Sequence, residues 1–525
     1  MGCHCFRDKK LLSSASLQLS SASEPSEIAR LAITPPKDPP KSTSAVHLRS
    51  ASSELPKLER QENLFRTAER KQTVCDWGNK KGNEGQLDLM EVGLKTVREV
   101  FGKLACYYRV EAGSARLLKA EQRETKKRCC IQICSLDTEQ QSWKRQRAEA
   151  MRTLDHPNIL RVLDILQAPN RLYVVCEDAN EGTAESLLEG RELGEECATV
   201  IMRQVFAALS HCHSRSLVCG SLSLKRILFA APPGENCMVK LLVSLECEDA
   251  KSQFIAPEVR KKQFYGPAND LYSCGIILSY LLTGDLGSKP KTVSSMKLRT
   301  SSRNLPRLSK EAKALLDSLL ASDYSRRPTV EECLRHPWLA VAQSKPAFDL
   351  CTRTALRNLA AIRPTSSLKK AFFSLMFNLV LTSDDLRTAE EAFTKLDTDL
   401  DGEVSEADLQ GSIFRLFPGK QAQTVFTAIT SIAVFSSERK MAYSEFLLWA
   451  SMPALLSLPN LTKAFQLLSQ SGENHVRGKH LRELLSLNAE KCLDLGAWRL
   501  LIESISGDDK DAFNFKQFCL FMQKV

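Results

Sequence analysis

The sequence predicts an α+β domain of two lobes, followed by an all-α domain, behind a disordered N-terminal tail. Between residues 100 and 340, strand-like apolar runs precede helical patterns, and after residue 382 a loop pattern repeats between helical segments. Residues 11 to 95 are rich in Ser, Pro, Lys and Glu, without a sustained period of 2 or 3.6. At 525 residues the chain is too long for one core, so two or three domains are expected.

The composition excludes several classes of protein. A hydrophobic fraction of 43% is ordinary for a globular protein, and no apolar run reaches the roughly 18 residues that a membrane-spanning helix needs. The net charge of +10 comes without a groove of alternating basic and aromatic residues, so we expect no nucleic-acid binding. The 18 cysteines match no zinc spacing and indicate reduced thiols of a cytoplasmic protein.

The chain begins MGCHCFRDKK, a candidate acylation signal on the tail at 1–95. Gly2 is a candidate for myristate, Cys3 and Cys5 are candidates for palmitate, and basic residues follow, so two lipid signals would place the protein peripherally at a membrane. Phe6 stands where a Ser or Thr is usual, and an unmodified tail is the alternative.

The α+β domain is expected over residues 100–340. Its strand-like runs are RLYVVCE at 171–177 and MVKLLVSL at 238–245. Its helical patterns include 199–214 and NDLYSCGIILSYLLTG at 269–284. LVCGSLSLKRILF at 217–229 has the apolar frame of a loop between two short buried strands, but no acid, base or metal ligand in its interior.

A junction at 341–381 precedes the all-α domain at 382–525. SSLKKAFFSLMFNLVL at 366–381 is apolar and amphipathic with a basic start, so we expect a helix that needs a partner surface. The Thr382 and Asp385 pair supplies a capping box for the helix that follows.

DTDLDGEVSEAD at 397–408 has the spacing of a calcium-binding loop, with Gly402 at the sharp turn and Val404 at the apolar eighth position. The expected oxygen ligands are Asp397, Asp399, Asp401, the Glu403 carbonyl and Asp408. Asp408 replaces the usual bidentate Glu and is one methylene shorter, so we expect one weakened Ca²⁺ site at which Mg²⁺ competes.

Three further loops start at Val434, Ser469 and Ser506, at spacings of 37, 35 and 37 residues. Their eighth positions, Met441, Val476 and Phe513, keep the apolar frame, whereas most carboxylate ligands are missing and Lys510 occupies a fifth position. Without that negative charge we expect these three loops to bind no metal. They should instead serve as packing units that pair within the domain.

The whole arrangement resembles the calcium-dependent protein kinases of plants and protists over about residues 100–525. The resemblance depends on LDHPNIL at 154–160, APEV at 256–259, NDLYSCGIILSYLLTG at 269–284, SRRPTVEECLRHPWL at 325–339 and the repeated loops. It implies a two-lobed protein-kinase-like domain and a calmodulin-like EF-hand domain, with an autoinhibitory-like helix at the junction.

Compared with that family, the catalytic positions are degenerate. The phosphate-binding lysine becomes Gln132 and its glutamate partner Arg147, with Glu149 two residues away; the Gly-rich loop keeps only Gly113. In the catalytic loop and the metal-binding motif the substitutes are Ser221, Ser223, Arg226 and Val243, and only ten residues separate Leu245 from Ala256. We therefore expect no catalytic residue and no ATP binding.

Residues that hold the lower lobe together in the family are retained, namely Glu258, Asp270, Arg327 and Trp338. His211, His213 and Cys176 are expected to pack rather than bind metal or react. Arg226 is either solvated or a metal-free anion contact.

The resulting hypothesis is a pseudokinase that acts as a membrane-tethered, weakly Ca²⁺-responsive scaffold or adaptor. Its partners would be an unidentified protein, the membrane surface and, within the chain, the junction helix against the EF-hand domain. The alternatives are an active Ca²⁺-dependent Ser/Thr kinase with substitute residues, and a constitutive adaptor that does not bind calcium.

Overall fold

The computed structural model describes residues 104–523, apart from 105–106, 112–116, 137–140, 169, 180, 190, 192, 221, 234–236, 246–251, 262–264, 285–307, 341–349, 363–366, 432–438, 470–473, 479–480, 482–501 and 507–511. All described residues belong to one compact unit. The expectations for the tail, including Gly2, Cys3 and Cys5, and those for Gly113, Ser221, Val434 and Lys510 lie outside the described residues.

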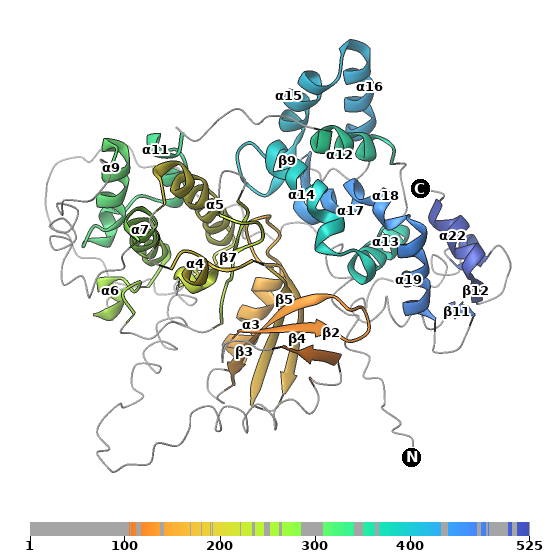
Figure 1. The fold of residues 1–525 in the computed structure, drawn as a ribbon, viewed down its shortest axis with the longest axis horizontal. Coiled ribbons are helices and arrows are strands. Elements are labelled where there is room, and N and C mark those ends of the chain that lie inside the picture. Colours follow the sequence, from red (N-terminus) through yellow and green to blue (C-terminus); the bar gives the residue numbers. More distant parts are fainter. Residues whose placement is uncertain are drawn as a thin grey trace, which may run out of the picture. The chain divides into compact units, whose positions relative to one another are not determined.

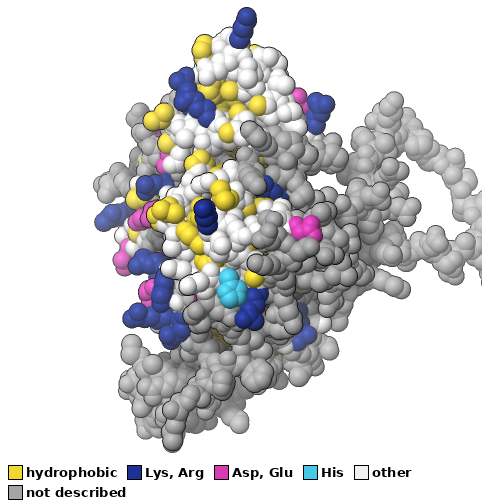
Figure 2. Space-filling model, turned by 90° about the vertical axis from the view of Figure 1, so that its right-hand side faces the viewer, with side chains coloured by type: hydrophobic (Ala, Val, Ile, Leu, Met, Phe, Trp, Pro, Cys, Tyr) yellow, Lys and Arg dark blue, Asp and Glu magenta, His cyan; other side chains and the backbone are white. Residues whose placement is uncertain are grey.

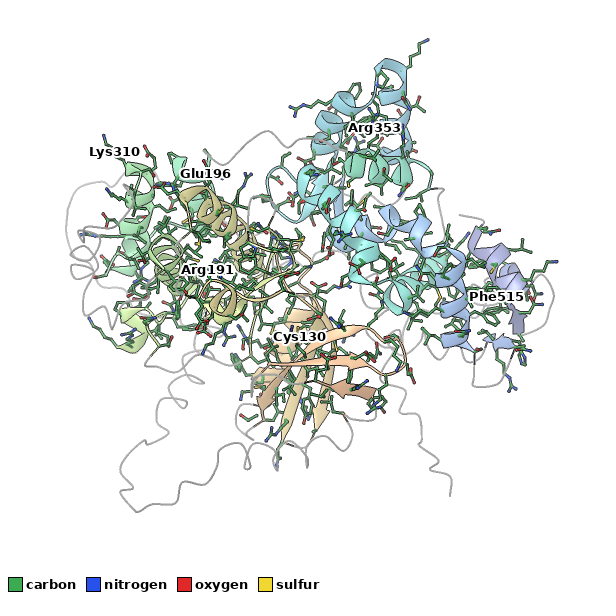
Figure 3. The ribbon with its side chains drawn as sticks, in the orientation of Figure 1. Cys130, Arg191, Glu196, Lys310, Arg353 and Phe515 are labelled. Carbon is green, nitrogen blue, oxygen red and sulfur yellow. The ribbon has the colours of Figure 1, made fainter. Side chains whose placement is uncertain are left out.

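An antiparallel sheet of five strands forms the first lobe (Figure 1). Its order is β1 (Tyr108–Val110), β2 (Leu117–Gln122), β3 (Arg128–Ser135), β5 (Arg171–Glu177) and β4 (Val162–Ala168), and α3 (Gln141–Arg152) packs against β4. β3 and β5 are buried on both faces, because Ile131 and Val175 point to one core and Cys130 and Val174 to the other. In Figure 3, Cys130 lies on β3.

The second lobe is mainly helical. It contains α4 (Ala184–Leu187), α5 (Glu195–Ser214), α6 (Pro257–Arg260), α7 (Pro267–Thr283), α9 (Lys310–Leu319), α10 (Val330–Leu334) and α11 (Pro337–Ala340), with the short 3₁₀ turns η4 (Leu224–Arg226) and η5 (Tyr324–Arg326). A small sheet joins β6 (Gly182–Thr183), β7 (Ile227–Phe229) and β8 (Val239–Leu241), so the strand expected at 238–245 is shorter.

The central helix of this lobe is α7, which is apolar on nearly every side and therefore almost fully buried. It ends at Gly284, whose left-handed backbone (φ 66°) lets its N–H bond to the Tyr280 carbonyl at 2.8 Å. A Cβ on Gly275 would lie 2.8 Å from Leu320 Cδ2, so the glycine permits close packing of α7 against α9.

The C-terminal domain consists of helix pairs joined by short strands. The first pair of units contains α14 (Ser383–Leu396), β9 (Glu403–Ser405), α15 (Glu406–Leu416), α16 (Gly419–Thr430), β10 (Lys440–Ala442) and α17 (Tyr443–Ala450). The second contains α18 (Met452–Leu455), α19 (Leu458–Leu468), β11 (His475–Arg477), β12 (Ala512–Asn514) and α22 (Phe515–Gln523). Val404 pairs with Met441, and Val476 with Phe513, which confirms the predicted alignment of the apolar eighth positions.

Two helices of the junction belong to the core of this domain. α12 (Leu350–Ala360) contacts α14, α16 and α17, and Arg353 projects from it (Figure 3). α13 (Ser367–Val380) packs Phe372 edge-on against Phe518 and Phe521, and Phe373 edge-on against Trp449. The sequence predicted α13 but not α12.

The predicted two-lobed α+β domain and all-α domain are thus both present, with separate hydrophobic cores. Among the described helices, none combines the length and the apolar character that crossing a bilayer requires.

Candidate functional site

The backbone of the catalytic-loop stretch is held by Asp270 at the start of α7. Its carboxylate, only 1% exposed, accepts hydrogen bonds from the N–H groups of Cys219 at 2.9 Å and Gly220 at 2.7 Å, and its Oδ2 lies 2.8 Å from His213 Nε2. Gly220 has φ 70°, and a Cβ there would lie 1.4 Å from the Tyr265 hydroxyl oxygen. The loop is therefore fixed by its backbone, whatever its side chains do.

The apolar frame of the same stretch is buried. Leu222, Ile227 and Leu228 belong to the core of the second lobe, as the sequence predicts. Ser223 is 1% exposed, and Arg226 ends η4, its N–H donating to the Ser223 carbonyl at 3.0 Å. The stretch thus serves as part of the core.

Gln132 and Arg147 both donate hydrogen bonds to backbone carbonyls across the cleft. Gln132, in the middle of β3, donates through Nε2 to the Val243 carbonyl at 2.9 Å. Arg147, on α3, donates through Nε to the Ser244 carbonyl at 2.9 Å. Its terminal nitrogen reaches the carbonyls of Val218 at 2.9 Å and Cys219 at 3.3 Å.

These contacts replace the ion pair that phosphoryl transfer uses. A lysine and a glutamate at these positions would attract each other and leave the lysine directed at phosphate, whereas a neutral amide and a guanidinium cannot form an ion pair. Arg147 is 7% exposed and Gln132 6% exposed, so both side chains are committed to bonds within the fold.

At the positions of the family's metal-binding motif the chain has Val243, Ser244 and Leu245, and the metal-binding aspartate is replaced by Val243. Val243 is 4% exposed, Leu245 is 2% exposed, and neither side chain carries an atom that can bind Mg²⁺. Val243 and Leu245 therefore contribute buried apolar side chains where the family has a metal ligand.

The pairing that stabilises the second lobe is intact. Arg327 forms a two-pronged contact with Glu258, at 2.6 and 2.8 Å, and also donates to the Ala268 carbonyl at 2.9 Å. Both side chains are buried, and the Trp338 ring nitrogen donates to Glu195 at 3.1 Å. Loss of one partner from such a buried charge pair strongly destabilises the fold, because the remaining charge is buried and unpaired.

The first loop of the C-terminal domain brings three carboxylates together. One oxygen each from Asp397, Asp399 and Asp401 lies within 4.8 Å of the others. The Gly402 N–H donates to Asp397 Oδ2 at 3.1 Å, and the Glu403 N–H donates to Asp401 Oδ1 at 2.8 Å. Gly402 has φ 85°, so the turn requires a glycine.

Asp397 carries the clearest sign of a ligand site. It is 3% exposed, and its Oδ1 has no hydrogen-bond partner in the structure. Burial and the neighbouring Asp401 raise the pKa of Asp397 to about 8. An unpartnered buried carboxylate oxygen is costly unless a cation reaches it, so these residues fit a hard divalent cation.

Asp408 is not part of this group of three. Its carboxylate accepts from the Thr398 hydroxyl, and from Ser405 through N–H at 3.1 Å and Oγ at 2.5 Å. It acts as the third residue of the cap of α15, so it can join a metal only by giving up those bonds. Glu403 is the first residue of β9 and lies opposite Ala442 of β10.

In two of the other loops, the side chain at the twelfth position bonds within the protein. In the second, Glu445 at the twelfth position accepts from Lys370 of α13. In the fourth, Gln517 at the twelfth position donates to the carbonyl of Ser506 at the first. The twelfth side chain of each of these two loops is thus already bonded to another part of the protein.

Polar contacts join the two domains. The Asp155 carboxylate accepts from Ser444 through Oγ at 2.7 Å and through N–H at 3.1 Å. The Lys240 ammonium, 4% exposed, lies 2.8 Å from Glu177 and 3.6 Å from Glu390. A Cβ on Gly402 would lie 2.6 Å from His156 Cδ2, so the first loop itself packs against the kinase-like domain.

Sequence reasoning missed two features, the helix α12 and the contacts of two lysines with loop carboxylates. The apolar spacing of Ala355, Leu356 and Leu359 could have revealed α12, because all three are buried. Lys370 contacts Glu445 and Lys440 contacts Asp401, both of which lie on calcium-loop positions. A lysine in the sequence does not by itself indicate which carboxylate it will contact. His211 and His213 lie at the end of α5, and the described residues contain no compact group of metal-binding side chains that includes them.

Comparison with known proteins identifies a family model and several relatives that resemble this chain. The family model "Protein kinase domain" matches residues 112–339. The chain is 24% identical over 414 residues to calcium-dependent protein kinase 4 of Plasmodium berghei. The aligned region covers 73% of this chain and 78% of the relative. It is also 24% identical to calcium-dependent protein kinase 19 of Arabidopsis thaliana, over 70% of this chain and 69% of that one.

A probable myosin light chain kinase of Dictyostelium discoideum is 30% identical over 200 residues, which cover 35% of this chain and 64% of that protein. The chain therefore contains a protein kinase domain, over residues 112–339. More particularly, the chain is homologous to calcium-dependent protein kinases over most of its length.

Proposed function

We propose that the protein is a catalytically inactive member of this group, a pseudokinase that acts as a signalling scaffold or adaptor. The observation that carries the proposal is the bonding of Gln132 and Arg147. Both side chains donate to backbone carbonyls of the segments that should hold metal and orient substrate. Neither is then available to bind phosphate.

The input to the scaffold would be a divalent cation at the first loop of the EF-hand domain. Ca²⁺ would be held by Asp397, Asp399, Asp401 and the Glu403 carbonyl, with Asp408 joining after it releases Thr398 and Ser405. The cation would supply positive charge to a cluster that otherwise repels itself. Weak affinity and competition by Mg²⁺ follow from the short twelfth side chain.

The junction helices would be the intramolecular partner of this domain. α13 packs Phe372 and Phe373 against aromatic rings of α22 in the second pair of units. It also joins the first pair, through Phe373 against Trp449 and Lys370 against Glu445. On α12, Arg353 lies over the ring of Phe417, with 5.5 Å from the guanidinium carbon to the ring centre. A cation that shifts the first loop would act on these helices.

The scaffold would bind a protein partner and a membrane surface. On the face in Figure 2, Lys and Arg side chains are more prominent than Asp and Glu, and apolar side chains lie among them. Phe414, on α15, is 48% exposed. Together with acylation at Gly2, Cys3 and Cys5, such a surface suits an acidic partner or an anionic membrane.

The proposal is tested by thermal melting of the full chain with ATP, with and without Mg²⁺. A ligand that binds only the folded state must raise the melting temperature. We expect no shift that grows with the concentration of Mg²⁺ and ATP together. A concentration-dependent rise would mean that the cleft binds the metal nucleotide, and would contradict the proposal.

A further inference from the structure

Lys440 lies on the second loop and contacts a carboxylate of the first. The pairing of β9 and β10 sets Lys440 opposite Ser405 and Ala442 opposite Glu403. From there the Lys440 ammonium bonds to Asp401 Oδ2 and lies 3.6 Å from Glu403 Oε2. Asp401 is one of the three clustered carboxylates, so a protein cation already contacts the proposed metal site.

We infer that Lys440 is a built-in competitor of the metal ion, which sets the affinity of the first loop. This inference rests on the proposed cation site. The contact with Asp401 neutralises part of the charge of the cluster before any ion arrives. A divalent ion that bonds to Asp401 must either displace the ammonium or accept a positive charge a few ångströms away.

The position of Lys440 makes displacement feasible. Its side chain is 32% exposed and that of Asp401 is 33% exposed, so the ammonium can move into water without leaving a buried charge unpaired. Asp397 is different, because it is buried and its Oδ1 has no partner. The cluster thus contains two different carboxylate oxygens: Asp397 Oδ1, which has no partner, and Asp401 Oδ2, whose partner is the displaceable Lys440 ammonium.

A neighbouring residue offers a matched control. Arg439 precedes Lys440 and carries the same charge, but it contacts Glu406 at 2.7 Å and is 75% exposed. Glu406 is outside the predicted ligand set. Removing Arg439 therefore changes the net charge equally without freeing Asp401.

The experiment measures Ca²⁺ binding to the full chain by isothermal titration calorimetry for wild type, Lys440→Met, Lys440→Arg and Arg439→Met. The interaction of a divalent ion with a single charge a few ångströms away in a partly solvated site corresponds to about a tenfold change in affinity. We expect Lys440→Met to bind Ca²⁺ about tenfold more tightly than wild type. Lys440→Arg and Arg439→Met should stay within about twofold, and added salt should narrow the gap for Lys440→Met.

The outcomes separate this inference from the proposed function. Equal affinity in wild type and Lys440→Met overturns the role of Lys440 while the metal site stands. Binding in Lys440→Met but not in wild type supports the role of Lys440 and contradicts a metal input in the native protein. If neither binds, both fail, and circular dichroism of Lys440→Met verifies that the variant is folded.

Discussion

Replacing Arg147 by alanine tests whether this side chain holds the cleft together. The substitution removes three hydrogen bonds, to the carbonyls of Ser244, Val218 and Cys219, from a side chain that is 7% exposed. At about 1 kcal/mol per bond, the free energy of unfolding of the kinase-like domain should fall by about 3 kcal/mol. Arg147→Glu, which restores the residue type of active kinases, should cost at least as much, because a carboxylate would face carbonyl oxygens.

The assay is chemical denaturation of the full chain followed by tryptophan fluorescence. Arg145→Ala is the matched control, since Arg145 is exposed on the same helix α3 and its loss should change stability by less than about 0.5 kcal/mol. If Arg147→Ala behaves like Arg145→Ala, the reasoning is wrong. A stabilised Arg147→Glu would refute it more strongly, because a carboxylate that faces the carbonyl oxygens of Ser244 and Val218 should destabilise the fold.

Three further predictions concern pH, metal and membrane. Burial raises the pKa of Asp164 to about 6, so between about pH 4 and pH 6 the unfolded chain ionises this group more readily than the folded protein, and wild type loses stability as pH rises. Between pH 4 and pH 7, the free energy of unfolding of Asp164→Asn should therefore rise by about 1–3 kcal/mol relative to that of wild type, measured by denaturation at both pH values. A difference between variant and wild type that is the same at both pH values would contradict this. Asp397→Ala should abolish calorimetric Ca²⁺ binding, because it removes the buried carboxylate of the cluster; retained binding would exclude the first loop as the site. The Gly2→Ala, Cys3→Ser, Cys5→Ser variant should move from the membrane to the soluble fraction of cells, and unchanged partitioning would remove acylation from the account.

Much of the fold is predictable because single elements follow simple patterns. The apolar run at 269–284 predicts a buried helix that ends at a glycine, and α7 ends at Gly284 in that manner. The apolar eighth positions predict which loops pair, since a side chain that must be buried needs an apolar neighbour across the strands. The capping box of Thr382 and Asp385 forms as predicted, with the Asp385 carboxylate 2.8 Å from the Thr382 nitrogen.

The new contacts of substituted residues are less predictable. That Gln132 and Arg147 cannot form an ion pair follows from their chemistry, but their bonds to Val243 and Ser244 join positions about 100 residues apart in the chain. Lys440 reaches Asp401 only because β9 and β10 set the register between two loops. Such contacts depend on tertiary geometry, which no local pattern encodes.

The measurement that tests the central claim most directly is phosphoryl transfer itself. Purified full-length protein would be incubated with labelled ATP, Mg²⁺ and a generic Ser/Thr substrate, with and without Ca²⁺, beside a mock preparation and a heat-denatured sample. The bonding of Gln132 and Arg147 predicts no transfer above the mock preparation to substrate or to the protein itself. Transfer that requires the folded protein and is absent from the mock preparation would contradict the claim that this kinase fold has lost its chemistry.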